Sequence, residues 1–216
     1  YGVIGSITPC TNPSETIIGK DNVGQLRLRW GLGCNDGRFS VVFRSPAVRN
    51  GLLYNSSAGS HLTAYNARSG HVLWAFSKDL SELNGWASQP AVSTDGVVIY
   101  PWENDPTYLF AVDGQTGAQI WESAVTFDVG FSGAARLVPT IDETNDVVYI
   151  LEEPFIGDGK LWAINMANGQ VAWWMGKPLY DASFVGSYAL LSGGKVYAAA
   201  DVPITPSPYR GESMLR

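Results

Sequence analysis

Acidic side chains gather in two short segments of this sequence, where their oxygen atoms could bind a cation. Both segments, 102–107 and 152–159, separate runs of strand-forming residues, and they hold five carboxylates: Glu103, Asp105, Glu152, Glu153 and Asp158. Carboxylate oxygens of this kind suit calcium, and the candidate metal ligands are Glu153 and Asp158. The same segments could instead be solvated loops that face a partner chain. The candidates for such contacts are Glu103, Asp105, Glu152 and Phe155.

Few other residues have side chains that could react or bind a ligand. The two cysteines, Cys10 and Cys34, could form a disulfide or could remain two free thiols. A disulfide would stabilise the fold by about 3 kcal/mol on the chain-entropy estimate. The two histidines, His61 and His71, form no metal-ligand spacing with a cysteine, and we expect both to be surface residues or to be satisfied by neighbours. An Asn-X-Ser sequence makes Asn55 a candidate glycosylation site. No pattern assigns a catalytic residue.

The composition narrows the class of protein. Of the 216 residues, 45% are hydrophobic, 12% aromatic and 16% charged. A coiled coil or a disordered chain would need more charge and fewer aromatic residues. No run of about 18 apolar residues occurs, so no transmembrane helix is predicted. The net charge of −6 without a basic run argues against a nucleic-acid partner. The acidic balance, the few lysines and the Asn55 sequence favour an extracytoplasmic location, either secreted or in an organelle lumen.

One pattern, Ala-X-Asp/Asn-X-X-Ser/Thr/Asn-Gly-X-X-X-Trp, occurs three times. Its alanines are 47 and 52 residues apart, which is close to the period of a four-stranded propeller blade. The Asp or Asn can bond to its own backbone and the glycine supplies a positive φ, so together they predict a turn between two strands. The tryptophan offers an apolar plate to a neighbouring blade. The shared positions are Ala64, Gly70 and Trp74, then Ala111, Gly117 and Trp121, then Ala163, Gly169 and Trp173.

A second element precedes each copy. Short runs that begin near Pro46, Pro90 and Pro139 lead into a Gly, Asn or Asp turn and then into a β-rich run, which predicts a hairpin. A fourth hairpin is predicted at 188–197. Each unit therefore supplies four strands, of which the first is innermost and the fourth carries the tryptophan.

These units resemble the tryptophan-docking repeat of the pyrroloquinoline quinone (PQQ) propeller proteins, the quinoprotein alcohol dehydrogenase-like superfamily. The resemblance implies an all-β fold, a β-propeller of four-stranded blades that forms about half a ring. A short N-terminal extension (1–25) would precede the partial propeller (26–216). The implied parts are a closing strand at 26–30, blade one at 41–76, blade two at 87–123, blade three at 135–175 and a partial blade four at 184–216.

The resemblance leaves two functions open. The first is a non-catalytic platform that binds or assembles other protein chains, as a subunit or fragment of a larger chain or complex. The alternative is a PQQ- and calcium-dependent dehydrogenase that oxidises an alcohol or sugar, in which Glu153 falls near the position of a calcium-binding glutamate. The resemblance to such enzymes also implies an adjacent cysteine pair against the cofactor or a Cys-X-X-Cys-His haem motif, and this sequence has neither. We therefore favour the platform, with no cofactor predicted.

Half a ring would leave two open flanks, with unpaired strand edges and apolar faces. We therefore expect that the native polypeptide continues past Arg216 or that another chain covers the opening. Mass spectrometry of the denatured polypeptide from its natural source tests this expectation. A mass well above 23.3 kDa would show a longer chain, whereas a stable, soluble monomer of 23.3 kDa would contradict the expectation.

Overall fold

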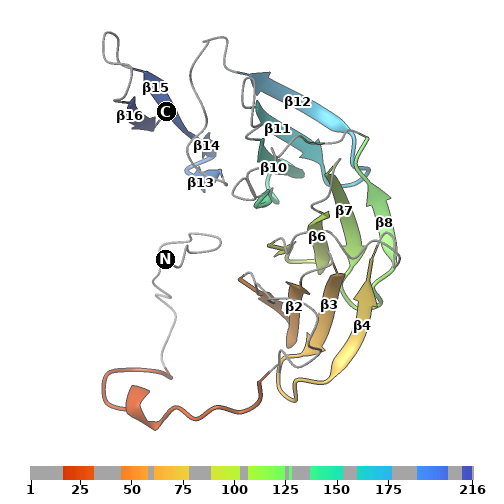
Figure 1. The fold of residues 1–216 in the computed structure, drawn as a ribbon, viewed down its shortest axis with the longest axis vertical. Coiled ribbons are helices and arrows are strands. Elements are labelled where there is room, and N and C mark those ends of the chain that lie inside the picture. The colour runs from red at the N-terminus through yellow and green to blue at the C-terminus, as the bar shows by residue number, and fades with distance from the viewer. Residues whose placement is uncertain are drawn as a thin grey trace.

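The computed structural model describes residues 17–31, 45–57, 61–77, 89–102, 107–124, 127, 137–152, 160–176, 189–203 and 211–215. Within these residues the strands build three four-stranded antiparallel sheets and two two-stranded sheets. The three larger sheets stand side by side along an arc, as the blades of a propeller do (Figure 1). The predicted all-β fold and the partial ring are therefore confirmed.

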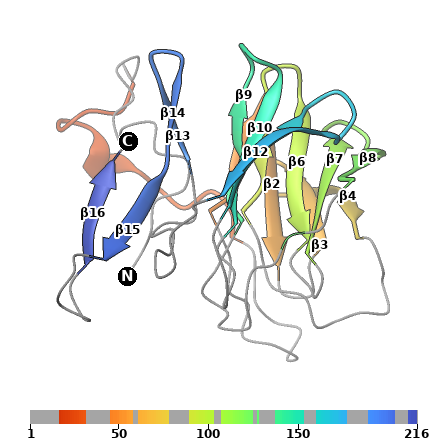
Figure 2. The same cartoon turned by 90° about the horizontal axis from the view of Figure 1, so that it is seen from above.

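Each four-stranded sheet uses its strands in chain order, from the inner to the outer side of the arc. Blade one consists of β1 (Ala47–Arg49), β2 (Leu52–Ser57), β3 (His61–Asn66) and β4 (Val72–Phe76). Blade two consists of β5 (Ala91–Val92), β6 (Val97–Trp102), β7 (Tyr108–Asp113) and β8 (Gln119–Glu122). Blade three consists of β9 (Thr140–Asp142), β10 (Val147–Glu152), β11 (Lys160–Asn165) and β12 (Val171–Gly176). Corresponding strand ends of the three blades lie on the same face (Figure 2).

The turn between the third and fourth strands is built in the same way in every blade. In blade two, the Asp113 carboxylate accepts the backbone N–H groups of Gln115 and Thr116 at 3.0 and 2.7 Å. Hydrogen bonds from the hydroxyl and the N–H of Thr116 lower the pKa of Asp113. Gly117 follows with φ of 77°, which a side-chain-bearing residue adopts only with strain. The predicted Asx–glycine turn is thus present.

Tryptophan rings join blade one to blade two and blade two to blade three. The ring of Trp121 covers Gly169 so closely that a Cβ atom there would lie 2.7 Å from the ring. Its Nε1 also donates a hydrogen bond to the carbonyl of Met166 at 2.6 Å. The same two contacts recur twice more along the arc. Trp30 covers Gly70 and donates to Ala67, and Trp74 covers Gly117 and donates to Gly114.

The hydrophobic core fills the spaces between blades rather than the interior of any one sheet. One cluster lies between blades one and two and includes Tyr54, Tyr100 and Phe110. A second lies between blades two and three and includes Ile99, Ile150 and Trp162. A third lies on the far side of blade three, where Ala189 joins it. Because both faces of blades two and three contribute to a core, their central strands are almost continuously apolar.

A buried carboxylate orders the hairpin between β9 and β10. Asp142 accepts the N–H groups of Thr144 and Asn145, at 3.1 and 3.2 Å, and lies 3.4 Å from the Tyr149 hydroxyl oxygen. Burial alone would raise the pKa of Asp142, but these hydrogen bonds outweigh it and hold the pKa below its usual value. The Tyr149 pKa moves the other way, because burial and the Asp142 charge both raise it.

One of the two ends of the arc differs from expectation. Residues 26–30 form no strand, because no described segment pairs with them, although Trp30 still contacts blade one. A 3-10 helix, η1 (Val23–Gln25), precedes them. At the other end, β13 (Leu190–Ser192) pairs with β14 (Lys195–Tyr197), and β15 (Ala199–Pro203) pairs with β16 (Gly211–Leu215). The predicted hairpin at 188–197 is therefore present, and a second strand pair follows it within the predicted partial blade four.

Replacing Trp121 by alanine should lower the free energy of unfolding by about 3–5 kcal/mol, because a large buried ring and its hydrogen bond are removed. Urea unfolding followed by far-ultraviolet circular dichroism measures the change. Trp173→Ala is the matched control: Trp173 holds the same position in blade three but is 40% exposed, whereas Trp121 is 7% exposed. The control should lose clearly less stability, and equal losses would contradict the role of the inter-blade contact.

Candidate functional site

A cleft of about 450 Å³ lies between the innermost strands of the arc. β1, β5 and β9 line it, together with residues 189–191. Its lining is mainly small and apolar, as shown by Ala47, Ala91, Ile141 and Leu190. The cleft lies on the concave side of the partial ring (Figure 1), which is the side that faces the axis of a propeller.

Two polar side chains of this cleft, those of Thr140 and Glu143, are engaged in hydrogen bonds. The Thr140 hydroxyl donates a hydrogen bond to the carbonyl of Ala189 at 2.7 Å. Glu143 supplies the one carboxylate among the lining residues that the structure describes, and it accepts the backbone N–H of Thr94. The described lining therefore offers shape and apolar contact rather than acid–base chemistry or a set of metal ligands.

A second candidate region lies where β10 ends and β11 begins. Glu152 pairs with Lys160 across the two strands, and its side chain is only 4% exposed. The carboxylate accepts a hydrogen bond from Trp162 Nε1 at 2.7 Å, and Lys160 Nζ lies 3.9 Å from the same oxygen. Burying a charge is unfavourable unless it is paired and hydrogen-bonded, and this carboxylate is both.

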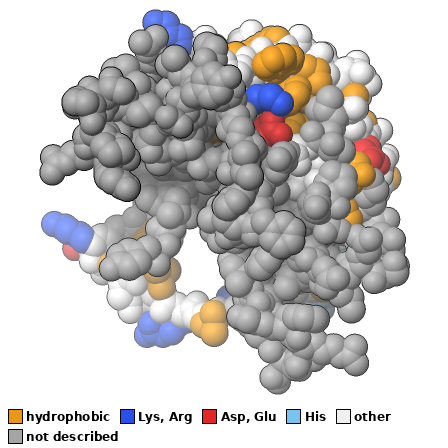
Figure 3. Space-filling model, turned by 45° about the horizontal axis from the view of Figure 1, so that its top comes forward, with side chains coloured by type: hydrophobic (Ala, Val, Ile, Leu, Met, Phe, Trp, Pro, Cys, Tyr) orange, Lys and Arg blue, Asp and Glu red, His pale blue; other side chains and the backbone are white. Residues whose placement is uncertain are grey.

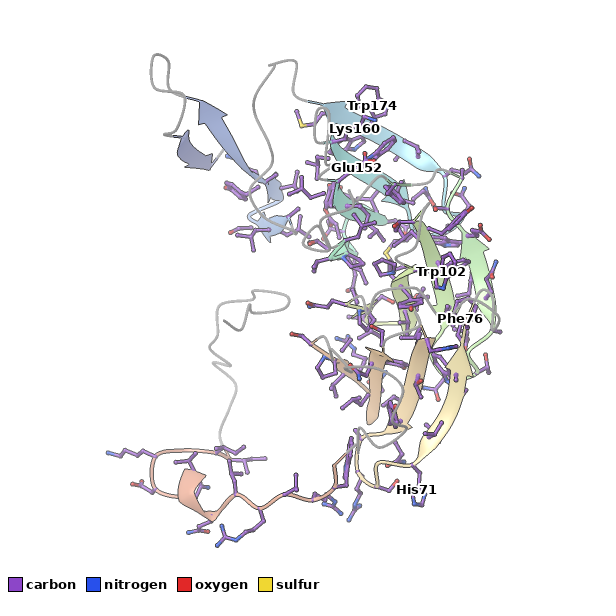
Figure 4. The ribbon with its side chains drawn as sticks, in the orientation of Figure 1. His71, Phe76, Trp102, Glu152, Lys160 and Trp174 are labelled. Carbon is purple, nitrogen blue, oxygen red and sulfur yellow. The ribbon has the colours of Figure 1, made fainter. Side chains whose placement is uncertain are left out.

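Two indole rings complete this cluster. Lys160 Nζ lies 5.3 Å from the ring centroid of Trp162 and 5.9 Å from that of Trp174, both within cation–π range. The two rings are 6.0 Å apart. Phe127 meets the Trp162 ring edge to face, with centroids 5.8 Å apart. Figure 4 shows Glu152, Lys160 and Trp174 together on blade three, which we call the blade-three cluster with Trp162 included.

In the other two blades, the positions equivalent to Glu152 and Lys160 carry side chains of a different chemical type. Where blade three pairs Glu152 with Lys160, blade two pairs Trp102 with Tyr108, and their rings lie 5.9 Å apart. The corresponding pair in blade one is Ser57 with His61. Among these three pairs, the blade-three pair alone combines a base with an acid. The strand ends thus vary while the turns and the tryptophans repeat.

Comparison with known proteins agrees with this architecture. The family model described as outer membrane protein assembly factor BamB matches residues 26–137 and 82–202. The chain belongs to this family of PQQ-type repeat proteins. Among solved structures, BamB from Moraxella catarrhalis superposes with a TM-score of 0.54 at 19% identity, over 73% of this chain and 48% of that one. A likeness at this identity shows the fold alone.

Curated relatives of the family include enzymes. The quinohemoprotein alcohol dehydrogenase ADH IIB of Pseudomonas putida is 27% identical over 56% of this chain. The quinoprotein alcohol dehydrogenase PedH, also from P. putida, is 24% identical over 73% of this chain. The chain spans only 18% and 27% of the lengths of these two proteins. Their similarity supports the assignment of this chain's repeats to the quinoprotein-like superfamily.

Two residues lie in surroundings that differ from those expected from the sequence. Glu152 was expected in an exposed loop facing a partner, but the strand ladder continues to the Glu152–Lys160 pair and buries the carboxylate. Asn55, the glycosylation candidate, lies inside β2 and is 6% exposed. A glycan on Asn55 would require this side chain to leave the sheet. His71 lies in a turn far from both candidate regions (Figure 4).

Several predicted residues lie outside the described part of the chain. These are Cys10, Cys34, Glu103, Asp105, Glu153, Phe155 and Asp158. Within the described ranges, no group of three or more His, Cys, Asp or Glu side chains could hold a metal ion. Among the same residues, no helix has the length and the apolar character that crossing a membrane requires.

Sequence reasoning missed Lys160, Trp162 and Trp174. One signal was available, because the Trp173–Trp174 doublet departs from the other two repeats, which carry Ala75 and Glu122 after their tryptophans. The burial of Glu152 had no such signal. It depends on how far the β10–β11 ladder extends.

Trp162→Phe should lower the free energy of unfolding by about 1–3 kcal/mol, because the buried Glu152 carboxylate loses a hydrogen-bond donor. Trp102→Phe is the control, since the Trp102 Nε1 is buried without an acceptor among the described residues. The ring becomes smaller by the same amount in both variants. Denaturant unfolding of both variants measures the difference, and an equal loss would show that the hydrogen bond to Glu152 has no net stabilising effect.

Proposed function

We propose that this chain is part of an extracytoplasmic β-propeller that acts as a non-catalytic platform, binding or assembling other protein chains as part of a larger chain or complex. The observation that carries the proposal is the contrast between the two candidate regions. Most side chains that line the axial cleft are apolar and its described carboxylate is hydrogen-bonded, whereas blade three presents exposed aromatic side chains beside a charged pair.

The exposed surface of blade three has the composition of a protein interface. Trp174 and Met175 are each 56% exposed. Tryptophan and methionine are enriched where proteins contact one another, and a few such anchors supply most of the binding energy. Figure 3 shows hydrophobic side chains gathered at the top of the molecule, where β12 lies, next to a basic and an acidic side chain.

The family to which the chain belongs supports the platform proposal, because the family model is described as an outer membrane protein assembly factor. An assembly factor for outer membrane proteins works outside the cytoplasm and contacts other chains. The repeated tryptophan–glycine contacts, which we interpret as tryptophan-docking motifs, give a platform the rigidity it needs. A rigid scaffold with variable strand ends can present new contacts without changing its fold.

The alternative is a PQQ- and calcium-dependent dehydrogenase that oxidises an alcohol or sugar. Its support is the similarity to two proteins named as alcohol dehydrogenases. The described residues do not fit such a cofactor site, since the axial lining supplies one carboxylate, Glu143, and that group already binds Thr94. We therefore derive no reaction step for this chain.

Two measurements on the complete polypeptide separate these functions. In a dye-linked assay with added PQQ and calcium, we expect no oxidation of primary alcohols, while a quinoprotein alcohol dehydrogenase in the same assay serves as the positive control. In gentle extracts of the source cells, we expect the polypeptide to elute in a complex larger than itself. Turnover in the assay together with elution as a free monomer would overturn the platform proposal.

A further inference from the structure

The outer strand of blade three is an open sheet edge. β12 pairs with β11 on one side and is the last strand of its sheet. Within the described part of the chain, no segment pairs with its other side. An edge strand of this kind presents a row of backbone N–H and C=O groups that can accept another strand.

The side chains of this edge differ from those of the other outer strands. After the repeated tryptophan, blade one carries Ala75 and the half-buried Phe76, and blade two carries Glu122 and the buried Ser123. Blade three carries Trp174 and Met175, both more than half exposed. β12, like β4 and unlike β8, holds neither a charged residue nor a proline, the two devices that usually protect an edge from strand addition.

We propose that β12 is the docking site for an extended segment of a partner protein, which adds a fifth strand to blade three. The inference rests on the platform function and names the kind of partner. The segment is apolar where it passes Trp174, and it carries an acidic residue near the end of β12, where Lys160 lies. Main-chain hydrogen bonds supply affinity in this mode of recognition, and alternate side chains supply specificity.

The acidic residue follows from the geometry around Gly176. Lys160 pairs with Gly176 across β11 and β12, so β12 itself has no side chain at that position. The Trp174 ring lies beside it, 3.3 Å from the place that a Cβ of Gly176 would occupy. The Lys160 ammonium is partly exposed, while its present partner Glu152 is buried and lies 3.9 Å away. A carboxylate arriving from an added strand would therefore reach a cation that is only loosely paired.

A second copy of this chain fits the edge less well. In an antiparallel self-pair centred between Trp173 and Trp174, Val171 of the second copy would lie opposite Gly176. Lys160 would then gain no carboxylate. A separate segment with its own acidic residue satisfies both the backbone edge and the charge.

A fluorescent ten-residue peptide of alternating threonine and valine, with one glutamate near its end, is the probe. We expect it to bind the complete polypeptide and to slow hydrogen exchange of the Ala172–Met175 amides at least about tenfold, since strand addition protects edge amides. A second peptide with lysine in place of the glutamate should bind several-fold more weakly. Absence of protection at β12 would overturn the proposal.

Three variants locate the binding. Trp174→Glu places the blade-two residue at the same register position and should abolish binding, while Leu73→Lys, at an exposed site on β4, should leave it unchanged. Lys160→Met should keep binding but remove the preference for the glutamate peptide. Near-ultraviolet circular dichroism checks that each variant is folded. Binding that survives Trp174→Glu would overturn the proposal.

Two further readouts distinguish the remaining cases. Concentration-dependent protection of β12 without peptide, together with a dimer in sedimentation, would show that a second copy occupies the edge and would overturn the partner assignment. If the native complex of the source cells still forms in Trp174→Glu, the platform function stands and a different surface carries it. Loss of that complex in Trp174→Glu, with Leu73→Lys unaffected, supports both proposals.

Discussion

The stacking of a tryptophan ring on a glycine of the next blade is the contact on which the rest of this structure depends. It occurs three times with the same two parts, a ring over a Cα without a side chain and an indole N–H bonded to a backbone carbonyl. The glycine serves twice, because its positive φ shapes the turn and its missing Cβ admits the ring. Trp74 and Trp121 each couple one blade to the following one, and Trp30 couples the segment before blade one to that blade, so the contact holds neighbouring parts of the arc at a fixed spacing.

This arrangement separates the parts that must repeat from the parts that can vary. Turns, tryptophans and central strands face neighbouring blades, so their volumes are fixed by packing. The ends of the second and third strands lie at the opposite end of each sheet from these turns. There the pairs Ser57–His61, Trp102–Tyr108 and Glu152–Lys160 occupy equivalent positions with unrelated chemistry. Function in such a scaffold therefore belongs to strand ends and edges, and blade three carries the chemistry that departs most from its neighbours.

The same reasoning explains how one repeat serves different proteins. The family model is described as an assembly factor, whereas similar curated proteins are alcohol dehydrogenases. A propeller supplies an axis, a set of strand ends and outer edges, and each can be used without altering the others. In this chain most described residues that line the axial cleft are apolar, and the outer edge of blade three is aromatic. Residues at those places, and not the fold, decide between binding and catalysis.

Four features could be predicted from the amino-acid sequence alone: the repeat, the four strands of each full blade, the Asx–glycine turns and the structural role of Trp74 and Trp121. These features are local or periodic, so composition and spacing are enough to predict them. Only the tertiary structure decided that Glu152 is buried, that Lys160 lies over two indole rings, and that Trp174 is exposed. The reason is physical: where a strand ladder stops, and what covers an outer strand, depend on pairing and packing between segments that are distant in the sequence.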